Sequence, residues 1–274
     1  MSDIKSMKLY THVERIENEL AELGIDPESA LHVDQLSKFD QLHYHGTDAL
    51  DLAMSVTDCE AGQSWLEVGS GIGGPARYLA DRGRIQLTAL ELQSDQCDLA
   101  ARLTRRCSLD HQVTHLCGDF LDYDFNGQKF DAVVSWLALY HIPDRTRLLR
   151  QCFDLLNPGG YFYTEDLCRN GEIDETQRRD LQRDLYAITL PEPEEYAQQL
   201  ESAGFDIVLQ QDMTKDWSRF THTRLADYRA ERERHLRVHG QPTVDALEAF
   251  YSAVDHQFQS GKLGGLRICA KRRS

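Results

Sequence analysis

Short apolar runs alternate with amphipathic segments through the middle of the chain. The runs are apolar on both faces, whereas the stretches between them repeat apolar residues at helical spacing. This pattern favours strands of a parallel sheet that helices cover on both sides. The expected strands are residues 64–68, 85–92, 113–117, 131–139 and 160–167, with helices around 74–81, 94–108 and 144–156.

The pattern continues with two further strands and a long helical stretch. A helix over 190–204 is entered through two prolines, and the strand 205–211 follows it. Residues 216–260 carry apolar positions on one helical face before a last strand at 265–271. The predicted fold is therefore α/β: a Rossmann-like, seven-stranded, mostly parallel sheet with helices on both faces and a helical insertion near the C-terminus.

The N-terminal part has a different pattern from the sheet region. Residues 4–23, including Ile4 and Met7, have helical spacing that ends at Gly24, and 33–58 form a second helical stretch broken near Gly46. We therefore divide the chain into a helical N-terminal segment, 1–58, and a main domain, 59–274. The main domain carries helical insertions at about 168–190 and 216–260.

Composition excludes several classes of protein. The net charge of −15, without a concentrated basic face, argues against nucleic-acid binding. No apolar run reaches the roughly 18 residues of a membrane span, and the N-terminus lacks the apolar core of a signal peptide. A cytoplasmic protein is therefore expected. Seven scattered cysteines without a CxxC pair indicate reduced thiols and no zinc site.

A glycine-rich turn follows the first strand. The stretch WLEVGSGIGG, residues 65–74, fits the spacing G-x-G-x-x-G at Gly69, Gly71 and Gly74. Glycines let the backbone turn tightly against a ligand, and an acid about 20 residues further on binds ribose hydroxyls. Glu91 stands at that position. Nicotinamide, flavin and S-adenosylmethionine sites all share these features.

Other residues separate these cofactors. Glu67 precedes the glycines, where a carboxylate suits the cationic sulfonium and amino groups of S-adenosylmethionine and would repel a pyrophosphate. Asp119 and Phe120, in CGDF after the third strand, suit the amino group and the ring of adenine. The fourth strand is followed by a helix and then by the turn 157–160 before strand five.

This succession resembles the class I S-adenosylmethionine-dependent methyltransferases over roughly residues 60–210. The stretches DQLHYHG (40–46), GGPARYLA (73–80) and GKLGGLRICAK (261–271) resemble the small-molecule branch, which includes phosphoethanolamine, glycine/sarcosine and tocopherol methyltransferases. The resemblance implies that segment 1–58 closes over the cofactor as a lid. It also implies that the insertions help to enclose the substrate.

The motifs and the resemblance together give the candidate binding residues. Those expected at the cofactor are Glu67, Gly69, Ser70, Gly71, Gly73, Glu91, Leu92, Gly118, Asp119, Phe120, Ser135, Trp136 and Gln41. Those expected at the substrate are His43, Tyr44, His45 and Glu165, the last as an acid at the rim of the site. The H-x-H pair lacks a third ligand at a recognisable spacing, so no metal is expected.

Tyr140 and His141 are the candidate catalytic residues. They come just after the fourth strand, before a helix that starts near Pro143. A neutral imidazole there can take a proton from an ammonium or hydroxyl nucleophile. The alternative is that His141 caps the following helix or binds backbone.

We therefore expect methyl transfer from S-adenosylmethionine to a small molecule, with nitrogen of an amine or amino acid as the favoured acceptor. Oxygen, sulfur or carbon acceptors are the alternatives. A nicotinamide oxidoreductase, a non-catalytic binding protein and a macromolecular substrate are the rival classes, and the first is disfavoured by Glu67. The expected partner is a small-molecule substrate, with neither nucleic acid nor membrane, and the protein is expected to be a monomer or homodimer.

Overall fold

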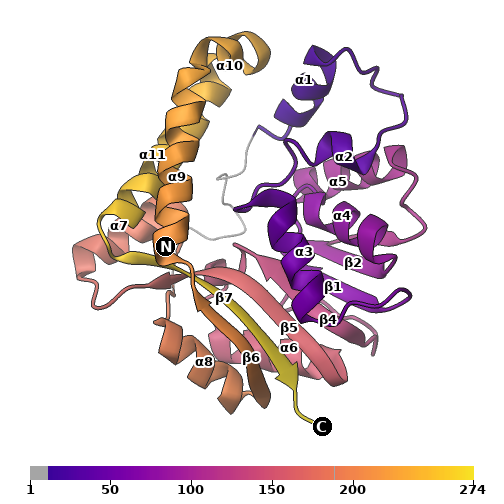
Figure 1. Ribbon diagram of the computed structural model, residues 1–274, viewed down its shortest axis with the longest axis vertical. Helices are drawn as coiled ribbons and strands as arrows, with labels where there is room; N and C mark the ends of the chain where they lie inside the picture. The colour runs from indigo at the N-terminus through magenta and orange to yellow at the C-terminus, as the bar shows by residue number, and fades with distance from the viewer. Residues whose placement is uncertain (1–11, 188) are drawn as a thin grey trace.

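A seven-stranded sheet, in the order β3-β2-β1-β4-β5-β7-β6, organises residues 12–187 and 189–274, which the computed structural model describes (Figure 1). The first five strands run parallel, and β7 is antiparallel to both of its neighbours. The expected seven-stranded, mostly parallel sheet is confirmed. The strands are β1 (Ser64–Val68), β2 (Gln86–Glu91), β3 (Val113–Cys117), β4 (Phe130–Trp136), β5 (Leu156–Arg169), β6 (Phe205–Asp212) and β7 (Leu263–Arg272).

Helices cover both faces of this sheet. One face packs against α3 (Gly46–Val56) and α4 (Gly74–Gly83), and α5 (Ser94–Arg106) lies beside α4. The other face packs against α6 (Arg145–Leu155) and α8 (Pro193–Ser202).

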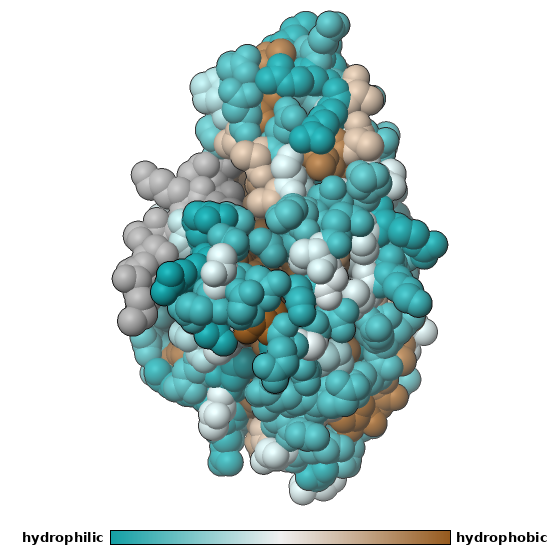
Figure 2. Space-filling model, turned by 90° about the vertical axis from the view of Figure 1, so that its left-hand side faces the viewer, coloured by the Kyte–Doolittle hydropathy of each residue, from teal (hydrophilic) through white to brown (hydrophobic). Residues whose placement is uncertain are grey.

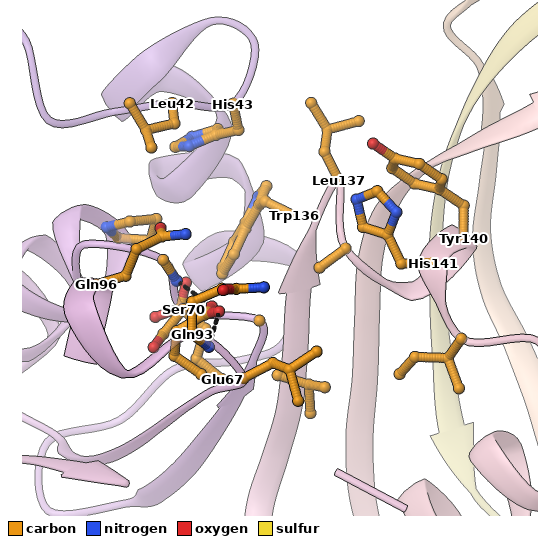
Figure 3. A pocket seen from close by; sticks show the side chains of 18 of the residues that line it. Leu42, His43, Glu67, Ser70, Gln93, Gln96, Trp136, Leu137, Tyr140 and His141 are labelled. Atoms are coloured by element: carbon orange, nitrogen blue, oxygen red, sulfur yellow. Dashed lines mark hydrogen bonds between the residues drawn. The ribbon is translucent and has the colours of Figure 1, made fainter. Parts of the chain in front are cut away.

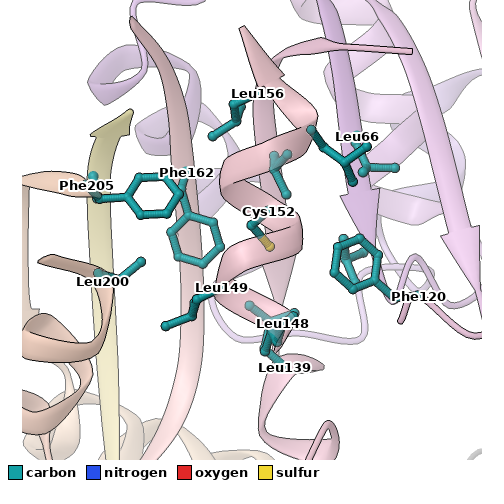
Figure 4. Packing of buried hydrophobic residues seen from close by; sticks show 14 of the residues in the cluster. Leu66, Phe120, Leu139, Leu148, Leu149, Cys152, Leu156, Phe162, Leu200 and Phe205 are labelled. Atoms are coloured by element: carbon teal, nitrogen blue, oxygen red, sulfur yellow. The ribbon is translucent and has the colours of Figure 1, made fainter. Parts of the chain in front are cut away.

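Each strand serves both helical layers because successive side chains point to opposite faces. Trp65 packs with the α3 and α4 layer, whereas Leu66 packs with the α6 layer. Figure 4 shows Leu148, Leu149 and Cys152 of α6 against the sheet residues on that second face. The two-sided apolar character of the sequence runs therefore has a direct structural cause.

Two strand boundaries differ from the sequence prediction by three or more residues. The fourth strand ends at Trp136 rather than at residue 139, because Leu137 takes a left-handed backbone (φ 53°) that turns the chain out of the sheet. The fifth strand already begins at Leu156, so the turn 157–160 is an irregularity inside β5, where the pairing with β4 shifts register.

The N-terminal segment contains short helices rather than two long ones. The described helices are α1 (Arg15–Glu22) and α2 (Val33–Leu36), followed by α3. Residues 37–45 separate α2 from α3, and the left-handed His45 and Gly46 make the predicted break. Ile4 and Met7 of the predicted first helix lie outside the described residues.

The insertions form a helical layer above the carboxyl ends of the central strands. They are α7 (Glu175–Leu185), α9 (Thr214–Ala230), α10 (Arg232–His239) and α11 (Gln241–Gln259) (Figure 1). Trp217 of α9 and Phe258 of α11 pack with Tyr44 of the N-terminal segment in one buried cluster. The outer surface on this side is largely hydrophilic (Figure 2). None of the described helices combines the length and the apolar character needed to cross a bilayer.

The close contact between α9 and β7 gives a test of this packing. A Cβ atom at Gly265 would lie 2.1 Å from the ring of Trp217, which is fully buried. We expect Gly265→Ala to lower the free energy of unfolding by about 1–3 kcal/mol, the usual cost of overpacking. Urea denaturation measures this, with Val208→Ala at an exposed position of β6 as the control. A loss no larger than that of the control would contradict the packing.

Candidate active site

A cavity of about 380 Å³ opens where the sheet order reverses, beside the carboxyl ends of β1, β2 and β4. Ligands bind at this position in open α/β sheets, because the loops diverge there. Of the sequence candidates, the cavity is lined by His43, Tyr44, Glu67, Gly69, Ser70, Gly71, Glu91, Leu92, Gly118, Asp119, Phe120, Trp136, Tyr140 and His141.

The glycine turn brings the backbone close to the ligand space. Gly69 has φ 75°, and a Cβ atom there would lie 2.3 Å from the Cβ atom of Ala138, so only glycine fits. The Gly71 amide donates to one carboxylate oxygen of Glu91 at 2.8 Å, and the Gln93 amide donates to the other at 2.9 Å. The turn therefore fixes the Glu91 carboxylate at the cavity wall.

Glu67 makes this end of the cavity suitable for a cation. Its side chain is buried, and its Oε2 atom has no hydrogen-bond partner among the described residues. Burial, and then the nearby Glu91, raise the pKa of Glu67 well above its usual range. A bound sulfonium or ammonium group would favour the charged carboxylate, so the site fits the cationic end of S-adenosylmethionine.

Two further polar atoms face this space. Ser70 Oγ and Trp136 Nε1 are buried, and neither has a partner in the described part of the chain. Buried polar groups are normally hydrogen-bonded, so such atoms in a cavity wall indicate a polar ligand. Figure 3 shows Ser70, Gln93 and Glu67 together below Trp136.

The adenine motif lies at the end of β3. Gly118, Asp119 and Phe120 all line the cavity, and Asp119 Oδ1 accepts from the Leu121 amide at 3.0 Å. Phe120 is buried in the core cluster below the cavity. This placement is compatible with the proposed contacts of Asp119 with the amino group and of Phe120 with the ring of adenine.

His43 covers the cavity from the N-terminal segment, above Trp136 (Figure 3). Its Nε2 lies 3.0 Å from the Gly46 carbonyl oxygen, which can only accept, so in the neutral ring Nε2 carries the hydrogen and Nδ1 the lone pair. Burial lowers the pKa of His43 to about 4. The ring is thus neutral at pH 7 and presents an acceptor.

His141 and Tyr140 lie across the cavity from Glu67 and Ser70, on the 3₁₀ turn Leu139–His141 (Figure 3). His141 Nδ1 lies 3.2 Å from the Tyr186 carbonyl oxygen, which assigns its hydrogen to Nδ1 and its lone pair to Nε2. Burial lowers the pKa of His141 to about 4, so the imidazole is neutral at pH 7. His141 thus makes the contact with backbone that the alternative interpretation expected. Its ring also lines the cavity.

The predicted position of Glu165 at the rim is wrong. Residue 165 lies inside β5 and is buried, and its carboxylate accepts from Arg267 at 2.7 Å and from the Tyr163 hydroxyl at 2.8 Å. The carboxylate is thus held inside the fold. His45 does not line this cavity either. Its Nε2 atom lies 2.5 Å from a carboxylate oxygen of Asp216.

Three cofactor candidates also lie outside the lining of this cavity. Ser135 Oγ donates to the Val68 carbonyl at 2.8 Å within the sheet. A Cβ atom at Gly73 would lie 2.8 Å from the His115 ring, so this glycine allows close packing of α4 rather than contact with a ligand. Gln41 lines a second cavity, of about 480 Å³, between the N-terminal segment and the insertion helices.

Sequence reasoning missed several lining residues. Gln93 and Gln96 follow Glu91 at the start of α5, and their nearness to the predicted ribose acid was the signal available. Arg224 of α9 and Tyr251 of α11 come from insertion helices without a recognisable motif. Both of these residues also line the second cavity, so the two cavities adjoin at this wall.

Comparison with known proteins agrees with this geometry. Residues 66–164 match the family of the methyltransferase domain. Phosphoethanolamine N-methyltransferase of Triticum aestivum is 26% identical over 212 residues, or 76% of this chain and 41% of the relative. Sarcosine/dimethylglycine N-methyltransferase of Halorhodospira halochloris is 27% identical over 73% of this chain and 71% of the relative. 24-Methylenesterol C-methyltransferase 3 of Arabidopsis thaliana is 25% identical over 78% of this chain and 64% of the relative. The chain thus spans between 41% and 71% of the lengths of these relatives.

Solved structures share the fold. A sarcosine dimethylglycine methyltransferase structure from Galdieria sulphuraria, described there as putative, has a TM-score of 0.72 at 14% identity and covers 95% of this chain and 98% of its own. A second structure is that of phosphoethanolamine N-methyltransferase 2 of Haemonchus contortus in complex with phosphomonomethylethanolamine and S-adenosylhomocysteine. It has a TM-score of 0.74 at 22% identity, and the match covers 83% of this chain and 53% of that one.

The fold is α/β, with a cavity beside the glycine turn at the carboxyl ends of the central strands. Residues 66–164 match the methyltransferase domain, and the relatives that match 73–78% of this chain are all named as methyltransferases. The cofactor of this chain is accordingly S-adenosylmethionine.

The role proposed for Glu91 can be tested by binding alone. We expect Glu91→Ala to weaken binding of S-adenosylmethionine and S-adenosylhomocysteine about 10- to 100-fold, because a hydrogen bond to a charged group contributes about 1.5–3 kcal/mol. Calorimetric titration measures both ligands, and NADH serves as the negative ligand. Asp98→Ala, an exposed acid on α5, is the control. Equal affinities for the two variants would remove Glu91 from the cofactor site.

Proposed function

We propose that this protein transfers a methyl group from S-adenosylmethionine to the nitrogen of a small amine or amino acid. The observation that carries the proposal is the neutral imidazole of His141, which lines the cavity opposite the carboxylates of the cofactor end. A nitrogen nucleophile needs a site that accepts its proton and excludes water, and this wall offers both.

The cofactor supplies a methyl group already activated on a sulfonium, so most of the catalysis assigned to the chain is positioning. Glu67, Glu91 and Asp119 hold the cofactor in this proposal. The apolar residues Leu137, Tyr140 and Val254 form the facing wall and keep water out. The N-terminal segment acts as the lid, and the insertion helices act as the substrate cap.

His141 acts on the proton of the acceptor in this proposal. An ammonium group has to lose a proton before its lone pair can attack, and Nε2 of His141 carries the lone pair that receives it. Tyr140, whose ring centroid lies 3.9 Å from that of His141, fixes the position of the imidazole.

Arg224 supports an amino acid as the substrate. Its guanidinium donates to the His43 carbonyl at 3.0 Å and lies over the rings of Tyr44, Phe220 and Tyr251. It forms no ion pair with any carboxylate of the described residues, and it borders the cavity. A substrate carboxylate would supply the missing counter-charge. The named activities of the Triticum and Halorhodospira relatives, both N-methyltransferases, also support nitrogen.

Carbon methylation of an apolar molecule is the second candidate. The facing wall is mostly apolar, and the Arabidopsis relative is named as a sterol C-methyltransferase. Formation of S-adenosylhomocysteine from S-adenosylmethionine, with amines, amino acids and apolar alkenes compared in parallel, separates the two candidates. Turnover with the alkenes alone would overturn the proposal of a nitrogen acceptor.

Substitution of His141 tests its role as a base. His141→Asn retains an N–H group for the Tyr186 carbonyl but lacks the basic nitrogen, so we expect a loss of about 10²–10⁴ in kcat/KM at unchanged cofactor affinity. Steady-state kinetics on the best amine measures this, with His222→Asn at an exposed position as the control. Activity of His141→Asn within about threefold of the wild type across pH would exclude general base catalysis by this residue.

Substitution of Arg224 tests the carboxylate contact. We expect Arg224→Gln to raise KM for an amino-acid substrate about 10-fold or more, since a charge-assisted hydrogen bond is lost, and to leave KM for the matching amine without a carboxylate nearly unchanged. Arg224→Lys should recover part of the loss. Arg219→Ala, an exposed arginine on the same helix, is the control. Equal effects on both substrates would contradict the contact.

A further inference from the structure

Three metal-ligating side chains meet where the N-terminal segment touches the insertion, away from the methyl-transfer cavity. They are Glu19 on α1 and His235 and His239 on α10, and their ligand atoms all lie within 4.8 Å of one another. The two histidines are four residues apart, which places them on the same face of α10. Glu19 is 220 positions from His239 in the sequence, so no motif spacing indicated the group.

The imidazole rings have nitrogen atoms available for a further ligand. The side chain of His239 is only 5% exposed, and its Nε2 lies 2.9 Å from Glu19 Oε1. The Nδ1 atoms of His235 and of His239 are buried without a hydrogen-bond partner among the described residues. Leaving buried nitrogens unsatisfied is costly, and a cation with its bound water would satisfy such groups.

The surroundings of Glu19 resemble those of a ligating carboxylate. Arg234 donates to Glu19 Oε2 at 2.6 Å and to Oε1 at 3.1 Å, and carboxylates that bind metals are usually held by such outer hydrogen bonds. The arginine charge opposes a divalent cation nearby. Glu231 acts electrostatically on Arg234 and opposes its charge, whereas Glu22 is paired with Arg237.

We propose that Glu19, His235 and His239 bind a divalent transition-metal ion that joins α1 to α10. Two imidazoles and one carboxylate suit zinc, whereas Mg²⁺ and Ca²⁺ prefer oxygen ligands alone. Bonds of about 2 Å in a tetrahedron need ligand atoms roughly 3.3 Å apart, so small side-chain rotations complete the site, with water in the fourth position.

The position gives the metal a structural role. His235 also lines the second cavity, which lies between the N-terminal segment and α9 to α11. A metal bound there would fasten α1 of the N-terminal segment to α10 of the insertion beside that cavity. The proposal does not depend on the methyl acceptor, because the site lies outside the catalytic cavity.

Binding of Zn²⁺ and Co²⁺ to the full-length, chelator-treated protein tests this inference without any methyl donor. We expect a single zinc ion per chain by calorimetry, a visible absorption band typical of four-coordinate Co²⁺, and a higher Tm with zinc. His235→Ala and His239→Gln should each weaken zinc binding at least 10-fold and abolish the rise in Tm. His256→Ala, an exposed histidine on α11, is the matched control.

Circular dichroism of the metal-free variants shows whether they fold, and His239→Gln keeps a polar side chain in case His235→Ala does not. Zinc binding that both variants retain, or the absence of stoichiometric binding by the wild type, would overturn the proposal. Neither result bears on the acceptor of the methyl group, which only the activity measurements address.

Discussion

The buried ion pair between Arg77 and Asp40 connects the N-terminal segment to the cofactor turn. The Arg77 guanidinium and the Asp40 carboxylate lie 2.9 Å apart, and both side chains are 1% exposed. Arg77 also donates to Ala100 and Thr104 of α5, so one side chain ties three parts of the chain together. Gly74 makes the approach possible, because a Cβ atom there would lie 2.3 Å from the Asp40 carbonyl oxygen. Removal of one partner of such a buried pair costs about 3–5 kcal/mol, so this contact contributes to holding the segment that bears His43.

The cavity beside this pair has two electrostatically different ends. Glu67 and Glu91 stand at the strand ends, where a bound cation would favour their charged forms, whereas Arg224 and the neutral imidazole of His141 stand on the opposite wall. Low-dielectric walls strengthen both fields. A ligand pair with positive charge at the sulfonium end and negative charge at the other end therefore matches the cavity as a whole.

Sequence patterning predicted the strands and the residues at their carboxyl ends, because both depend on local spacing. It failed where long-range packing decides the position of a side chain. Glu165 was expected at a rim, but β5 continues to Arg169 and pairs there with antiparallel β7, which supplies Arg267 as a partner. In the N-terminal segment, His43 lines the first cavity, Gln41 lines the second, and Leu42 lines both. The position of Arg224 at the cavity depends on how α9 packs, and no local sequence pattern predicts that packing.

The place of β7 in the sheet has a consequence for the order in which the fold assembles. This strand follows all the others in the chain, yet it lies between β5 and β6 and is the strand that joins β6 to the rest of the sheet. As the ribosome extends the chain, β1 to β5, with Glu67 and Glu91 at the strand ends, emerge first. During that interval the edge of β5 has no partner strand, and β6 has no strand to pair with. The nascent chain thus passes through a stage with an exposed strand edge, which is where chaperone binding or misassociation would act.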